Sequence, residues 1–132
     1  MSPRSISAVL ILVAAGVLAG CRDGGWQGAR PAPGVVSAAE VARGGTLFLR
    51  SCAACHGRLG QGIRGLGPDL RGNAFVASRP DADLVRFLEV GRRASDPGNK
   101  TRIDMPPRGG NPGLTDADLA AIVAWLRALE RP

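Results

Sequence analysis

The chain has few of the large aromatic residues that usually fill the core of a small protein. Its 132 residues include three Phe, two Trp and no Tyr, and much of its apolar content is alanine. A chain of this length has room for one small domain. Because its side chains alone would make a thin core, we expect the fold to need a covalent staple or a large apolar cofactor.

The only extended uncharged run of the chain lies near the N-terminus, and it is shorter than a typical membrane-spanning helix. It extends from Ser5 to Gly20, after the single cation Arg4 and before Cys21. A cation, an apolar run and small residues in this order are typical of an export signal. The run lies just under the roughly 18 residues expected of a spanning helix, so an uncleaved signal anchor is the alternative.

The end of this run, LAGC at residues 18–21, resembles the lipobox of bacterial lipoproteins. The resemblance implies that residues 1–20 are a signal peptide and that the Cys21 thiol carries a lipid after cleavage. Residues 21–36 are rich in Gly, Pro and Ala and are interpreted as a flexible tether. We therefore expect a lipoprotein anchored to the membrane through Cys21, on the periplasmic or outer-facing side of a bacterial cell envelope.

The folded domain is predicted over residues 37–132, and its fold class is all-α. Ser37 and Glu40 have the spacing of a capping box, so a helix should begin there and run into the next two cysteines. A second helix is predicted over residues 80–91, and a third from Thr115 as its cap. Gly- and Pro-rich loops separate the helices, and no run is typical of a strand.

Two cysteines and the only histidine of the chain stand together in SCAACHG, residues 51–57. A thioredoxin-like pair would need a preceding strand, and a structural zinc site would need four ligands. A disulfide between Cys52 and Cys55 would leave His56 without a role. C-x-x-C-H is the attachment signature of c-type haem, in which both thiols bond the vinyl groups and the imidazole lies under the iron. One covalent haem c would also supply the missing core.

With this motif placed, the chain resembles the class I (mono-haem) cytochromes c of the small bacterial type. Gly44 and Phe48 stand eight and four residues before Cys52, and Trp125 lies in the last predicted helix. These positions match the residues at which the terminal helices of the family cross. The resemblance implies three to four short helices wrapped around one covalently attached haem.

The resemblance also implies how the haem is held. Pro68 stands twelve residues after His56, and its carbonyl is expected to accept a hydrogen bond from the imidazole nitrogen that does not bind iron. Met1 belongs to the signal, so Met105 is the candidate sixth ligand, opposite His56. The usual Tyr and Trp contacts to a haem propionate are missing. The candidates to replace them are Arg64, Arg71 and Arg102.

Ligation by His and Met fills both axial positions and raises the haem potential, which favours electron transfer over catalysis. We therefore expect a membrane-tethered electron carrier, not an enzyme, that passes single electrons between respiratory-chain partners. One alternative is a haem-c subunit of a larger oxidoreductase complex, such as a terminal oxidase or a quinol-oxidising assembly. The other is a gas-binding or peroxidase-like haem protein with a displaceable Met105.

The positive net charge of the chain indicates what kind of partner it binds. Without Arg4 the formal net charge falls from +6 to +5. Nucleic acid is an unsuitable partner for an exported chain without aromatic stacking platforms. We expect a basic rim that steers an acidic redox partner; ordinary solvated surface, or contact with anionic lipid, is the alternative. The ten cations of this rim are Arg58, Arg64, Arg71, Arg79, Arg86, Arg92, Arg93, Lys100, Arg102 and Arg108.

Overall fold

The computed structural model describes residues 35–130. The predicted signal peptide, Cys21 and most of the predicted tether lie outside the described residues. The helices are α1 (Ala38–Ser51), α2 (Ala53–His56), α3 (Ala74–Ala77), α4 (Asp81–Val90), the 3₁₀ turn η1 (Pro107–Gly110) and α5 (Asp116–Leu129). The described part contains no strand beyond two isolated bridges, which confirms the all-α prediction.

Local capping fixes where the two longest helices begin. At α1, Ser37 Oγ accepts a hydrogen bond from the Glu40 amide, and the Glu40 carboxylate accepts one from the Ser37 amide. At α5, Thr115 and Asp118 exchange the same pair of bonds. Each capping box satisfies amides at the helix start that have no partner within the helix. The predicted starts of both helices are therefore confirmed.

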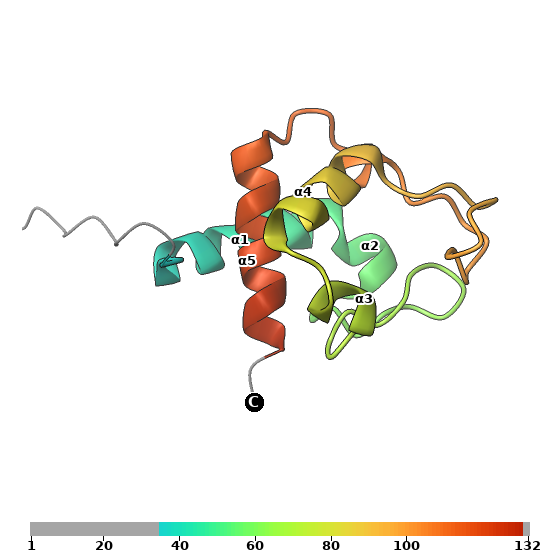
Figure 1. The fold of residues 1–132 in the computed structure, drawn as a ribbon, viewed down its shortest axis with the longest axis horizontal. Helices are drawn as coiled ribbons and strands as arrows, with labels where there is room; N and C mark the ends of the chain where they lie inside the picture. The colour runs from blue at the N-terminus through green and yellow to red at the C-terminus, as the bar shows by residue number, and fades with distance from the viewer. Residues whose placement is uncertain (1–34, 131–132) are drawn as a thin grey trace, which may run out of the picture. The chain divides into compact units, whose positions relative to one another are not determined.

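Helices α1 and α5 cross, as Figure 1 shows in cyan and red. Gly44 lies at the crossing, where a Cβ built on it would overlap the carbonyl oxygen of Ala121 and lie 2.5 Å from its carbon. Beside it, the rings of Phe48 and Trp125 are 4.3 Å apart between centroids. The absence of a side chain at Gly44 thus lets the two backbones approach, and the aromatic pair fills the adjoining space.

The connection between α3 and α4 is tied to α5 through one arginine. The Arg127 guanidinium donates to the Val76 carbonyl at 2.7 Å and to the Asp81 carboxylate at 2.9 Å, and it also contacts the Arg79 carbonyl. Helix α3 is capped by the side chain of Asn73 and was not predicted. Arg127 therefore fixes this short helix and the start of α4 against the C-terminal helix.

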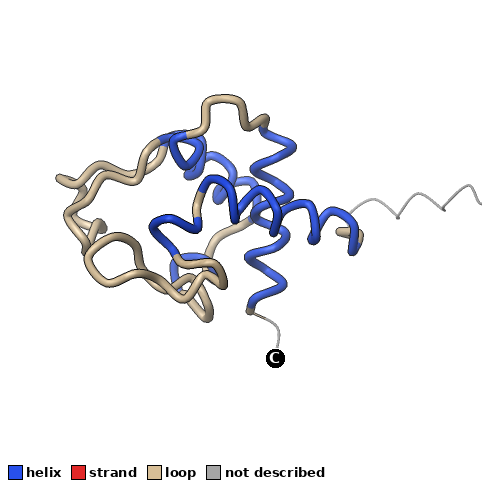
Figure 2. Tube along the Cα trace, turned by 180° about the vertical axis from the view of Figure 1, so that it is seen from behind, coloured by secondary structure: helices blue, strands red, loops and turns tan. Residues whose placement is uncertain are grey.

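The core lies between α1, α4 and α5. Its most deeply buried large side chains, all less than 2% exposed, are Phe48, Leu119, Ile122 and Val123. Figure 2 shows the long loops, residues 57–73 and 91–106, gathered on the side away from the C-terminal helix. No helix within residues 35–130 combines the length and the hydropathy needed to cross a bilayer.

Candidate haem site

A cavity of about 580 Å³ lies between the helices and the two long loops. This volume is within the range of roughly 300–1,000 Å³ typical of cofactor sites. The same apolar residues that form the core also line the cavity, among them Phe48, Leu84, Leu88, Ile122 and Leu126. The core, which the composition predicted to be thin, is therefore open to this cavity.

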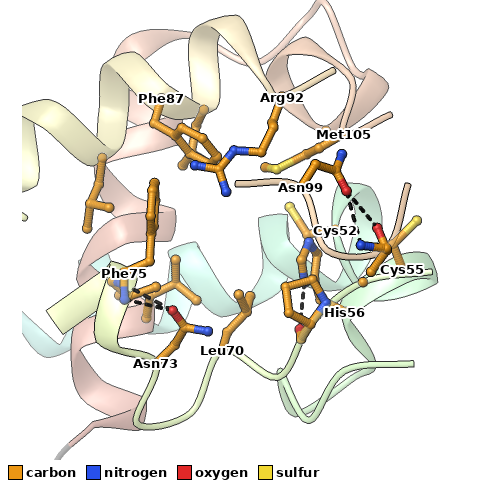
Figure 3. Close-up of a pocket in the computed structure, with 18 of the residues that line it drawn as sticks. Cys52, Cys55, His56, Leu70, Asn73, Phe75, Phe87, Arg92, Asn99 and Met105 are labelled. Carbon is orange, nitrogen blue, oxygen red and sulfur yellow. Dashed lines mark hydrogen bonds between the residues drawn. The ribbon is translucent and has the colours of Figure 1, made fainter. Parts of the chain in front are cut away.

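Both cysteines of the CAACH motif line this cavity (Figure 3). Cys52 follows the last residue of α1, and Cys55 lies in α2. Both are free thiols. Burial, and secondarily the neighbouring Cys55, raises the pKa of Cys52 to about 11, so this thiol stays neutral at physiological pH. The arrangement presents two thiols, three residues apart, to one apolar space.

His56 is buried at the wall of the cavity, and its ring is oriented by a hydrogen bond. Its Nδ1 lies 3.0 Å from the carbonyl oxygen of Pro68. Because a carbonyl can only accept, Nδ1 carries the proton and Nε2 keeps its lone pair. Gly67 allows this approach, since a Cβ there would lie 2.6 Å from the Cys55 carbonyl oxygen and 3.1 Å from His56 Cε1. The imidazole is thus prepared as a ligand.

Met105 reaches the same cavity from the second long loop (Figure 3). Its backbone exchanges two hydrogen bonds with Arg92, at 2.9 and 2.8 Å. Gly91, with φ of +72°, packs so closely against this pair that a Cβ would overlap the Met105 carbonyl oxygen. Pro106 and Pro107 follow. The methionine is therefore held by backbone contacts on one side and by two prolines on the other.

Sequence reasoning missed Asn99, which organises the loop leading to Met105. The side chain is 8% exposed, and its amide nitrogen donates to the carbonyls of Arg93 at 3.0 Å and Ile103 at 2.7 Å. Its oxygen accepts from the backbone amides of Thr101 and Arg102. An asparagine in a Gly- and Pro-rich loop was the available signal, because asparagine side chains commonly close turns.

The cations on the cavity wall differ from the three named as propionate contacts. Arg64, Arg71 and Arg102 are not among the lining residues, and Arg71 pairs with Asp69 at 2.7 Å. Arg79, Arg92 and Lys100 line the cavity instead. The three candidates therefore lie off the cavity wall, because loop conformation and not distance along the sequence decides which side chains point inward.

The predicted basic rim also needs one correction. Arg108 lies largely inside the fold, where it donates to the Leu114 carbonyl at 2.7 Å and pairs with Asp116 at 2.8 Å and Glu89 at 3.4 Å. Its hydrogen bond to Asp116 lowers the pKa of that carboxyl. Within residues 35–130, the exposed rim cations without an ion pair are Arg58, Arg64, Arg93, Lys100 and Arg102.

The donor set fits a c-type haem. Two thiols, an imidazole with a free Nε2 and a thioether line one apolar cavity. One buried polar atom on its wall, Nε of Arg92, has no hydrogen-bond partner among the described residues. A bare metal ion fits less well, because no group of three His, Cys, Asp or Glu side chains in this part of the chain could hold one. The residues present therefore suit a large apolar group that brings its own metal and acceptor atoms.

Comparison with known proteins agrees with this geometry. The sequence model of the Cytochrome c family matches residues 41–130. Cytochrome c-555 of Prosthecochloris aestuarii is 32% identical over 89 residues, which cover 66% of this chain and 85% of that protein. The crystal structure of cytochrome CL from the marine methylotroph Methylophaga aminisulfidivorans MPT superposes with a TM-score of 0.55 at 25% identity. That match covers 72% of this chain and 56% of cytochrome CL. The chain therefore belongs to the cytochrome c family and is an electron-transfer protein with covalently bound haem c.

Proposed function

We propose that the protein is a mono-haem electron carrier in which His56 and Met105 are the axial ligands. The observation that carries this proposal is that both side chains line one apolar cavity, together with the two thiols of the attachment motif. Haem c, when bound, supplies a one-electron iron couple. With both axial positions filled, electron transfer is favoured and substrate binding at the iron is not.

The protein around the site supports this role in two ways. The mostly apolar lining would keep water from most of a bound haem, and a drier site favours the less charged, reduced iron. The Arg92 backbone and Asn99 hold the loop that presents Met105. A ligand held by its own loop can stay in place in both oxidation states, as an electron carrier requires.

Replacing Met105 tests this proposal. We expect Met105→Ala to lose the weak near-infrared charge-transfer band from sulfur to ferric iron, to lower the potential and to let the ferrous iron bind small ligands. Val90→Ala is a matched control, because Val90 is exposed, does not line the cavity and lies just before the Gly91 contact. Near-infrared absorption of both holoproteins is the measurement. A spectrum unchanged by Met105→Ala would mean that another group binds the iron.

We further propose that the carrier is tethered to a membrane through a lipid on Cys21 and works at the periplasmic or outer-facing side of the cell envelope. The sequence supports this through the export signal and the LAGC segment, which end at Cys21. Two or more acyl chains on one residue suffice for stable anchoring.

Removing the thiol of Cys21 tests the tether. We expect Cys21→Ser to keep covalent haem but to lose stable association with membranes, because the atom that carries the lipid is gone. Fractionation and intact mass of the purified chain are the measurements. A variant that still sediments with membranes and retains residues 1–20 would favour the signal-anchor alternative.

The partner proposed for this carrier is an acidic redox protein, with a terminal oxidase or a quinol-oxidising complex as candidates. Its support is the set of exposed unpaired cations, among which Arg58 and Arg64 lie in the loop that follows the haem motif. We expect electron exchange with the partner to slow as ionic strength rises, since the screening length shortens from about 30 Å at 0.01 M to about 8 Å at 0.15 M.

Charge reversal at one cation checks the steering prediction. Arg64→Glu should slow the second-order exchange at low salt and leave the potential nearly unchanged. Arg86→Glu makes the same charge change on α4 at a rim cation that is already paired with Asp83, so steering by the unpaired cations predicts a smaller effect there. Stopped-flow rates across a salt series are the measurement. Equal rates for the two variants and wild type would leave the rim as ordinary surface.

A further inference from the structure

We infer that Arg92, with Arg79 beside it, binds a propionate carboxylate of the haem at the end of the cavity opposite the cysteines. The inference rests on the proposed function, because it takes the haem to occupy this cavity with its vinyl edge at Cys52 and Cys55. Arg92 and Arg79 thus take the role of propionate contact for which the sequence had offered other arginines as candidates.

The chemistry of haem determines which end of the cavity receives a negative charge. The vinyl groups lie on one half of the macrocycle and the two propionates on the other. Figure 3 shows Cys52 and Cys55 on one side of the cavity and Phe75 and Phe87 on the other, with the Arg92 guanidinium beside Phe87. A haem bonded to both thiols therefore extends its carboxylates toward the arginine end.

The surroundings of Arg92 leave one of its donors available. Its Nη1 donates to the Gly98 carbonyl at 3.1 Å, but its buried Nε has no hydrogen-bond partner within residues 35–130. The Asp96 carboxylate is 3.8 Å from Nε, which is beyond hydrogen-bond distance. A buried unpaired N–H is unfavourable, and a carboxylate oxygen is the acceptor that a guanidinium binds best.

The aromatic residues at this end hold the guanidinium in place. Its central carbon lies 4.6 Å from the Phe75 ring centroid and 4.8 Å from that of Phe87. The corresponding carbon of Arg79 lies 3.6 Å from the Phe75 centroid. These contacts orient planar cations and keep water from them, so a carboxylate placed here is bound more strongly than at an exposed arginine.

The cavity wall carries more cations than acids. Lys100 and Asp104 also line the cavity. The Asp104 carboxylate is already engaged, because it accepts a hydrogen bond from the Ala94 amide. On the cavity wall Arg79, Arg92 and Lys100 thus outnumber Asp104, and Asp96 is the acid that the structure pairs with the Arg92 side chain, at 3.8 Å.

Arg92 also connects this end to the candidate axial ligand, since its backbone exchanges two hydrogen bonds with Met105. It is thus a positioning residue in two respects: its main chain holds the methionine loop and its side chain fixes the cofactor's carboxylate. A cation near the haem also favours the reduced form, which carries one positive charge fewer.

The test compares Arg92→Gln with Arg93→Gln in the purified holoprotein. Both variants lose one positive charge, but Arg93 is exposed and absent from the cavity wall. We expect Arg92→Gln to lower the reduction potential clearly more than Arg93→Gln. It should also increase the pH dependence of the potential, because a carboxylate without its cation takes up a proton at higher pH.

Arg92→Lys keeps the charge but lacks the planar donor pair, so its shift should be smaller and in the same direction. If Arg92→Gln yields no holoprotein, Arg92→Lys replaces it in the comparison, and Arg93→Lys is then the control. Equal potentials and equal pH dependence for the changes at positions 92 and 93 would overturn the inference. The near-infrared band distinguishes the two failures: a wild-type protein without it refutes Met105 ligation, whereas a retained band with equal shifts refutes only the role of Arg92.

Discussion

Replacing Cys52 and Cys55 together with alanine should yield a chain that carries no covalent haem and shows no cooperative thermal unfolding. The core and the cavity share their lining side chains, so the haem fills the centre of the domain. If the haem removes on the order of 400 Å² of apolar surface from water, at about 25 cal/mol per Å² it contributes about 10 kcal/mol. The net stability of a small domain is only about 5–15 kcal/mol, so the haem-free chain cannot keep this fold.

Denaturing gel electrophoresis with haem detection, together with circular dichroism during heating, measures this result. Ala54→Ser is the matched control, because Ala54 lies between the two cysteines but is exposed. It should attach haem and unfold as wild type does. A double variant that unfolds cooperatively without haem would contradict the view that the cofactor completes the core.

The second large effect is expected at the helix crossing. A methyl group at Gly44 would overlap the Ala121 carbonyl oxygen, and this backbone atom cannot move aside unless α1 and α5 separate. Replacing a helical glycine with alanine gains about 1 kcal/mol in helix propensity. Overpacking of a tight core costs typically about 1–3 kcal/mol and sometimes more. We expect the packing cost to win, with a net loss of about 2 kcal/mol for Gly44→Ala and more for Gly44→Val.

Such a loss corresponds to a fall of roughly 10 °C in the melting temperature of a domain of this size. Ala42→Val is the control, since it adds bulk to an exposed position of the same helix. Calorimetry of the holoproteins gives the comparison. A Gly44→Ala protein as stable as wild type would show that the helices can separate at little cost and that the glycine is not needed for their contact.

Features of the structure that depend on residues close together along the chain could be predicted from the sequence. The starts of α1 and α5 were predicted because Ser37 with Glu40, and Thr115 as a cap, act within one helical turn. The attachment motif was equally local. Pro68 was found through family spacing, and the structure places its carbonyl at hydrogen-bond distance from His56.

Features that depend on distant contacts were not predicted. Helix α3 has only four residues, and Arg127 from the far end of the chain fixes its position. Arg92 enters the cavity because Gly91, at φ +72°, turns the chain there and because two aromatic rings receive its side chain. Arg108 was assigned to the surface, although partners from α4 and from the start of α5 hold it inside. Composition and spacing carry no information on such contacts.

The most direct test of whether protein ligands fill both axial positions of the iron is carbon monoxide binding to the ferrous wild-type holoprotein. Absorption spectroscopy after rapid mixing measures it. If His56 and Met105 fill both positions, carbon monoxide should bind the wild-type protein slowly or hardly at all. It should bind rapidly only to the Met105→Ala variant. Fast, saturating binding of carbon monoxide to the wild-type protein would contradict the proposal and favour a gas-binding or peroxidase-like haem protein.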